Sequence, residues 1–259
     1  MNYTVASLIA CTALFFGMLL VSSAAYRFGR RRLQETGAAS ESAGAITGAV
    51  FALLGLLIAF TFSGAFARLD ARRQLIVKEA NAIGTAYLRL ELLPAEARDP
   101  LKELFRRYVA SRAALYEHLA DSPAAQRELA KAAELQNEIW KRAVSASSRA
   151  EHPSVPMLLL PALNEMIDIV AVRTVAISTH TPVIIYVTLS IIALVCVGMT
   201  SYRAAAGERG PSLSYHAMLA AVTAFTLYII LDIEYPRHGI VRLDDVNRLL
   251  VELGETMKQ

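Results

Sequence analysis

Long stretches without any charged residue alternate with charged segments along the chain. Four such runs, of 26, 26, 29 and 22 residues, are Met1–Tyr26, Ser42–Ala67, Thr174–Tyr202 and Gly210–Leu231. About 20 helical residues cross a hydrocarbon core about 30 Å thick, so each run is long enough to span a bilayer. The pattern predicts four transmembrane helices, at about 4–26, 44–67, 181–202 and 212–232.

The charged segment between the second and third runs predicts a helical insert. Apolar residues recur with helical spacing over 69–90 and 101–119, and more weakly over 129–144. Asp99-Pro100 and Ser122-Pro123 each resemble the start of a helix, with a capping side chain followed by proline. No segment alternates as a strand would. We expect an all-α integral membrane protein: hairpins 1–67 and 174–231 flank a soluble insert, 68–173, and a polar tail follows, 232–259.

Composition and charge narrow the function classes. Hydrophobic residues make up 55% of the chain, and the clustering of all charges outside the four runs excludes a single soluble domain. The net charge is only +3, with no basic patch that favours nucleic-acid binding. The five histidines are scattered without metal-ligand spacing, and no catalytic constellation is present, so we expect neither an enzyme nor a bound cofactor.

Arginine counting gives two opposing answers about membrane sidedness. Four arginines between 27 and 32 follow the first run and none precedes it, which favours an outside N-terminus. Over the whole chain, however, the side that carries the insert has more positive residues than the opposite side. The sidedness of the insert therefore stays open at this stage.

The second charge-free run has the most regular internal pattern. Small residues recur every three or four positions and form one stripe along the helix: Gly44, Gly48, Ala52, Gly55, Ala59 and Ser63. Such stripes let helices pack closely inside a membrane, within or between protomers. Beside the stripe lie Leu56, Phe60 and Gly64, and in an oligomer the bulky members could form a hydrophobic constriction around an axial pore.

Charged residues lie at the ends of the second and fourth runs. Arg68, Asp70, Arg72 and Arg73 follow the second run. They are candidates either for ordinary anchoring at the membrane surface or for a basic ring that concentrates anions at a pore mouth. Asp232, Glu234, Asp244 and Asp245 follow the fourth run. They could face water, bind a divalent cation or control gating, or pair with the arginines, although their spacing is not that of an EF-hand.

Two segments resemble bestrophins. Phe51–Gly55, followed by Arg68 and Asp70–Arg72, is similar to the second membrane helix of bacterial bestrophins, and Ile233–Pro236 resembles their Ile-Glu-x-Pro-Phe-Gly segment. A closer resemblance is to uncharacterised, bestrophin-like bacterial membrane proteins with four membrane helices. Phe60–Ser63, Asp70–Arg73, and Asp232, Glu234, Pro236 and Gly239 carry it.

This resemblance implies a largely helical homo-oligomer, a pentamer in bestrophins, in the inner membrane of a bacterium. It implies a channel that passes small anions past a neck on the second helix, at Leu56, Phe60 and Gly64. Gly64 departs from the pattern because it has no side chain to form a constriction. The alternative function is a non-conducting, membrane-anchored interaction or sensor protein that acts through its insert.

Overall fold

The computed structural model describes residues 3–36, 43–117, 123–205, 213–235 and 244–258. Every regular element in these ranges is helical, which confirms the all-α fold. The chain divides into two compact units, Met1–Leu69 with His180–Val241, and Asp70–Thr179 with Arg242–Gln259. We call them the membrane unit and the insert unit.

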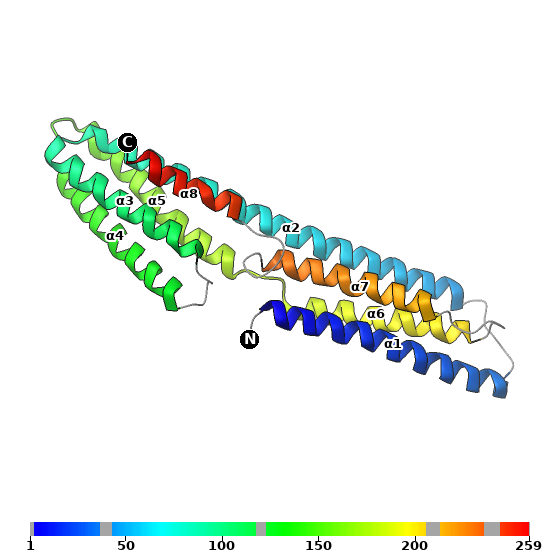
Figure 1. Cartoon of the computed structure of the whole chain (residues 1–259). Helices are drawn as coiled ribbons and strands as arrows, with labels where there is room; N and C mark the ends of the chain where they lie inside the picture. The colour runs from blue at the N-terminus through cyan, green and yellow to red at the C-terminus, as the bar shows by residue number, and fades with distance from the viewer. Residues whose placement is uncertain (1–2, 37–42, 118–122, 206–212, 236–243, 259) are drawn as a thin grey trace. The chain divides into compact units, whose positions relative to one another are not determined.

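The membrane unit contains the apolar helices. These are α1 (Tyr3–Thr36), the first part of α2 (Ala43–Arg89), α6 (Val183–Ala204) and α7 (Leu213–Glu234). Helix α1 packs against both α6 and α7, as Figure 1 shows. Four helical stretches of the described chain are long and apolar enough to cross a membrane: Thr4–Arg32, Gly44–Leu92, Ser154–Ala204 and Ser214–Glu234.

Small residues bring α1 and α6 close together. The Ser201 hydroxyl donates a hydrogen bond of 2.9 Å to the Ser22 hydroxyl, and both residues are buried. A Cβ atom at Gly29 would lie 2.9 Å from the carbonyl oxygen of Tyr202, so only glycine permits this approach. Close contacts of this kind are how helices associate where lipid removes the hydrophobic driving force.

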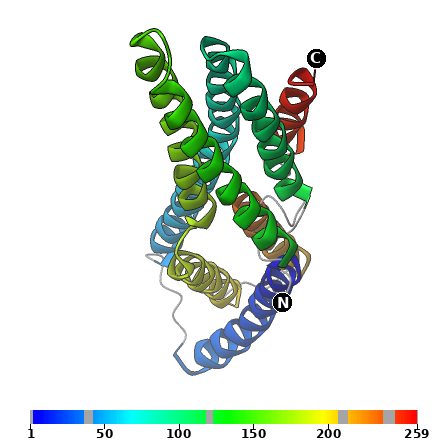
Figure 2. The ribbon, with the colours of Figure 1, turned by 90° about the vertical axis from the view of Figure 1, so that its left-hand side faces the viewer.

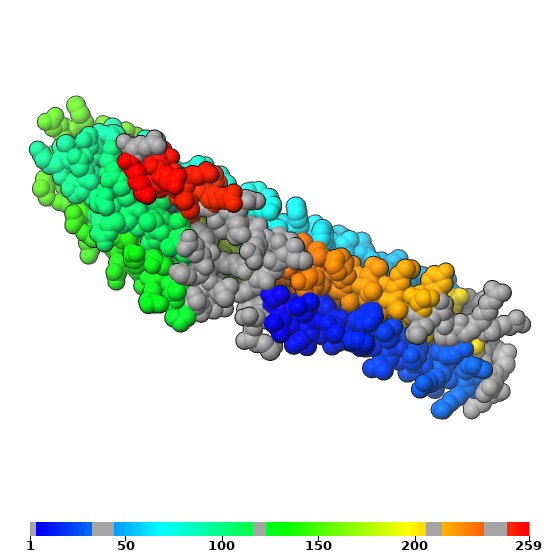
Figure 3. Space-filling view, in the orientation of Figure 1, coloured from blue at the N-terminus to red at the C-terminus, as the bar shows by residue number. Residues whose placement is uncertain are grey.

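The insert unit is a helical bundle with its own core. It contains the second part of α2, the short 3-10 helix η1 (Leu90–Leu92), α3 (Ala95–Glu117), α4 (Pro123–Ser147), α5 (Ser154–Ser178) and α8 (Asp244–Thr256). Helices α3 and α4 run side by side (Figures 1 and 2). Figure 3 shows α8, in red, covering part of α3. Ile83, Phe105, Tyr108, Ile139 and Leu163 are fully buried at the centre of this core.

The predicted start of one helix is wrong, one predicted cap lies outside the described residues, and one helix was not predicted. Helix α3 starts at Ala95 rather than at Pro100, because the Pro94 carbonyl accepts the amides of Ala97 and Arg98 and begins the helix one turn earlier. Pro100 is tolerated near the helix start, where few intrahelical bonds are lost. Ser122, the other predicted cap, lies outside the described residues, although α4 does begin at Pro123. The polar tail contains α8, which the sequence pattern did not predict.

Candidate functional site

Helix α2 is one continuous helix of 47 residues with a buried side and an exposed side. In the membrane unit the buried side includes Thr47, Leu54, Ala65 and Leu69. These positions are 7, 11 and 4 residues apart, each close to a whole number of helical turns, so they share one side of the helix. On the remaining side of this part of α2, many residues are exposed in the part of the chain that the structure describes.

The small-residue stripe lies mostly on the exposed side of α2. Gly48, Ala52, Gly55, Ala59 and Ser63 are all exposed, and Gly44 is half-buried. A Cβ atom added at Gly48 or Gly55 would meet no atom of the chain within 4 Å. Contacts within one chain therefore do not explain why these positions are small.

The proposed constriction residues lie beside the stripe. Leu56 is 52% exposed and Phe60 is 66% exposed, whereas Gly64 is half-buried. Leu56 directly follows Gly55 and Phe60 directly follows Ala59, so each large apolar side chain projects about 100° around the helix from the small residue before it, on a neighbouring exposed face of α2. The exposed side of α2 combines room for close helix contact with bulky apolar groups.

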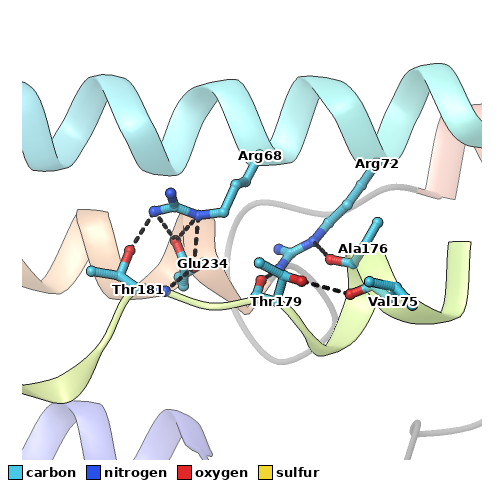
Figure 4. A network of polar contacts seen from close by, with 7 residues as sticks. All are labelled: Arg68, Arg72, Val175, Ala176, Thr179, Thr181 and Glu234. Carbon is cyan, nitrogen blue, oxygen red and sulfur yellow. Dashed lines mark hydrogen bonds and ion pairs between the residues drawn. The ribbon is translucent and has the colours of Figure 1, made fainter. Parts of the chain in front are cut away.

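At the end of this segment Arg68 forms a polar cluster with Glu234 and Thr181. Figure 4 shows the Arg68 side chain reaching from α2 to Glu234 at the end of α7 and to Thr181, which precedes α6. Its Nε donates to Glu234 Oε1 at 3.0 Å, and its Nη2 donates to Oε2 at 3.0 Å and also to the Thr181 hydroxyl. Glu234 Oε1 accepts the backbone amide of Thr181 at 2.8 Å as well. Arg68 and Glu234 form a pair of the kind that the sequence suggested as one alternative for the acidic segment and the arginines.

Arg72 has a different set of partners, at the end of α5. Its Nε donates to the carbonyl of Ala176 at 3.1 Å, and its Nη2 donates to the carbonyl of Thr179 at 2.8 Å, as Figure 4 shows. A cation there satisfies carbonyl groups left free at the end of a helix and complements the helix dipole. Arg72 is only 5% exposed, so it acts as a buried cap.

The other charged candidates are placed as follows. Asp70 is exposed and accepts a hydrogen bond of 2.7 Å from the side-chain amide of Gln74, and Arg73 is half-buried.

Asp232 is buried at the end of α7. Asp244 and Asp245 begin α8, but their side chains lie outside the described residues. Among the residues that were described, no three histidine, cysteine or acidic side chains gather in a way that could hold a metal ion. The cation or gating site stays a prediction.

Sequence reasoning missed a buried charge cluster inside the insert unit. Glu79, with no exposed surface, accepts a hydrogen bond of 2.6 Å from Arg112 Nε and another from Arg173 Nη1. Burial disfavours the charged form of Arg112, but the charge of Glu79 and its hydrogen bond outweigh this and raise the guanidinium pKa. Burial raises the pKa of the neighbouring Tyr108 phenol. Glu79 shares a helix face with Ile76 and Ile83, and a carboxylate on such a buried face is the signal that could have found the cluster.

Comparison with known proteins identifies the family. A model of the bestrophin-like domain matches residues 9–247, nearly the whole chain. The chain belongs to the bestrophin-like family. A search of curated proteins gave no match to this bestrophin-like protein.

Solved structures of a bacterial bestrophin homologue from Klebsiella pneumoniae resemble this bestrophin-like protein in fold. One, carrying a point mutation, has a TM-score of 0.68 at 12% identity and covers 93% of this chain and 98% of that chain. Another, solved by Zn-SAD phasing, has a TM-score of 0.64 at 16% identity and covers 93% and 97%. At such low identity the likeness shows that the fold is shared. The four long apolar helices indicate, by their length and composition, a multi-pass membrane protein.

Proposed function

We propose that this bestrophin-like protein forms a homo-oligomeric channel in a bacterial inner membrane and passes small anions. The α2 helices of the subunits surround the pore, their small residues pack against neighbouring subunits, and Leu56 and Phe60 narrow the pore. A ring of apolar side chains can gate ion flow because a narrow apolar passage loses its water. The subunit number is taken as five by resemblance to bestrophins.

The exposed side of α2 is the observation that carries this proposal. Phe60 is 66% exposed in the chain, and the five small residues beside it are exposed as well. A surface that only faced lipid would have no need for a continuous row of small residues, whereas a subunit interface would. The membership in the bestrophin-like family supports the same interpretation.

Flux measurements on protein reconstituted into liposomes test the proposal. We expect the wild-type protein to carry chloride, and we expect Phe60→Ala to increase the chloride flux severalfold. A smaller apolar side chain would widen the constriction and lower the cost of wetting it. The matched control is Phe225→Ala on α7, because Phe225 is similarly exposed, at 64%, but lies on another helix. Its flux should equal that of the wild type.

The absence of flux for every ion tested, from a homogeneous assembled oligomer, would contradict the channel. That result would favour the non-conducting protein that acts through its insert. An equal effect of Phe60→Ala and Phe225→Ala would contradict the constriction.

A further inference from the structure

Among the charged residues that follow the membrane segment of α2, the geometry singles out Arg68. We propose that Arg68 is the residue that contacts the permeating anion at the insert end of the proposed pore, and that Glu234 positions it. This inference rests on the proposed channel function and names the residue that selects for anions.

Arg68 continues the row of constriction residues. Leu56, Phe60, Gly64 and Arg68 follow one another at intervals of four residues. Each interval of four turns the position by about 40° around the helix axis, since a helix has 3.6 residues per turn. Over the three intervals Arg68 comes to lie about 120° around α2 from Leu56 and about 80° from Phe60, so the row follows a gradual turn around the helix from apolar side chains to a charged one.

Gly64 leaves room for the Arg68 guanidinium. A Cβ atom at Gly64 would lie 3.4 Å from Arg68 Nη1 and 3.7 Å from Nη2. Side chains on a helix lean toward its N-terminus, so the Arg68 side chain extends back over the preceding turn. The space that a bulky side chain at position 64 would fill is thus taken by the Arg68 guanidinium.

The pair with Glu234 leaves the positive end of the ion pair open to solvent. Glu234 binds Nε and Nη2, and its side chain is 1% exposed, whereas that of Arg68 is 30% exposed. No hydrogen bond from Nη1 to a described residue is recorded. An approaching anion would meet N–H donors while the carboxylate stays covered. Because Glu234 offsets part of the charge, binding would be weak enough for release, as conduction requires.

Arg72, although one turn further on, has a different role. It is 5% exposed, and its Nε and Nη2 donate to the backbone carbonyls of Ala176 in α5 and of Thr179, which directly follows α5. Removal of its charge would disturb the end of a helix rather than a surface that ions could reach.

Zero-current potentials across planar bilayers, measured under a potassium chloride gradient, test the proposal. We expect the wild-type oligomer to favour chloride over potassium. Arg68→Gln should lower the chloride-to-potassium permeability ratio by severalfold, and Arg68→Lys should keep most of it because the charge remains. Arg127→Gln on α4 is the matched control, since Arg127 is an exposed arginine outside this row, and it should leave the ratio unchanged.

A second pair of variants tests the roles of Glu234 and Gly64. Glu234→Gln keeps a hydrogen-bonding group but removes the negative charge, so the ratio should rise and the current should saturate at lower chloride concentration. Gly64→Leu should lower the ratio, because the added side chain displaces the guanidinium. These two variants decide the question if Arg68→Gln fails to assemble.

The two possible failures are distinguishable. An assembled wild-type oligomer without any current contradicts the channel itself. A current whose permeability ratio is the same in wild type, Arg68→Gln and Glu234→Gln overturns the assignment of Arg68 and leaves the channel standing.

Discussion

Three buried charged side chains of the insert unit pair with one another across three helices. Glu79 of α2 binds Arg112 of α3 and Arg173 of α5, and each of the three is less than 5% exposed. Such clusters add less stability than their contacts suggest, because removing charges from water is costly. Removal of one charged member nevertheless lowers the stability strongly, because the other members lose a charge that they bind in the protein interior.

Glu79→Gln should therefore destabilise the insert unit. It removes the carboxylate charge that two buried guanidinium groups share, and we expect the free energy of unfolding to fall by about 3–5 kcal/mol. Chemical unfolding of the full chain in detergent, followed by fluorescence, measures this loss, because Trp140 is the single tryptophan and packs against the insert core.

Glu103→Gln is the matched control for Glu79→Gln. Glu103 pairs with Arg106 at the surface, where the two side chains are 59% and 35% exposed. Loss of an exposed pair costs about 0.2–1 kcal/mol. Equal losses in the two variants would show that the buried cluster has no special importance.

At the scale of the element, α2 joins two kinds of environment in a single helix. Its buried side continues from Leu54 in the membrane unit to Ile76 and Ile83 in the insert unit. Its exposed side has small and bulky apolar residues in the membrane unit. In the proposed channel, the exposed side in the membrane unit lines the pore, and the buried side of the insert part belongs to the core of the insert unit.

Gly55→Leu should weaken the proposed oligomer. No described residue elsewhere in the chain lies within 4 Å of an added Cβ, so the substitution is compatible with the folded protomer. Between close-packed helices the larger side chain would force them apart. Light scattering of the detergent-solubilised particle should give a lower mass. Ala221→Leu, at an exposed position on α7, is the control and should keep the wild-type mass. An unchanged mass for Gly55→Leu would contradict a subunit interface along the stripe.

At the scale of the whole molecule, residues distant in sequence complete the insert unit. Leu250 and Met257 of the C-terminal segment are buried in its core. The carbonyl of Met257 accepts hydrogen bonds from the Tyr87 hydroxyl, at 3.2 Å, and from Arg106 Nε, at 2.8 Å. The segment predicted only as a polar tail is therefore part of the folded insert.

Leu250→Asp should release α8 from the insert unit. Leu250 has no exposed surface, and a carboxylate there would be buried without a partner, at a cost of several kcal/mol. Limited proteolysis should then cut the C-terminal segment much faster than in the wild type. Val251→Asp is the adjacent control, because Val251 is 49% exposed and tolerates a charge. Equal cleavage rates in both variants would contradict a packed α8.

The sequence predictions were accurate where a feature depends on interactions between residues that are close together in the chain. The four long apolar helices and the helical segments of the insert over 69–90, 101–119 and 129–144 were predictable, because hydrophobic length and helical periodicity are local properties. The predicted start of α3 was wrong. Asp99-Pro100 resembled a cap, but the carbonyl of Pro94 accepts the first hydrogen bonds of the helix. Helix α8 was missed because its amphipathic pattern covers only 13 residues.

By itself the sequence determined an all-α chain with four long apolar helices, the small-residue stripe on one of them and the resemblance to bestrophins. Only the tertiary structure decided which side of α2 is left uncovered, and it alone paired Arg68 with Glu234, 166 positions away, and Glu79 with Arg112 and Arg173. The physical reason is that hydrophobic periodicity acts within a few helical turns. The partner of a buried charge, in contrast, depends on how distant helices pack together.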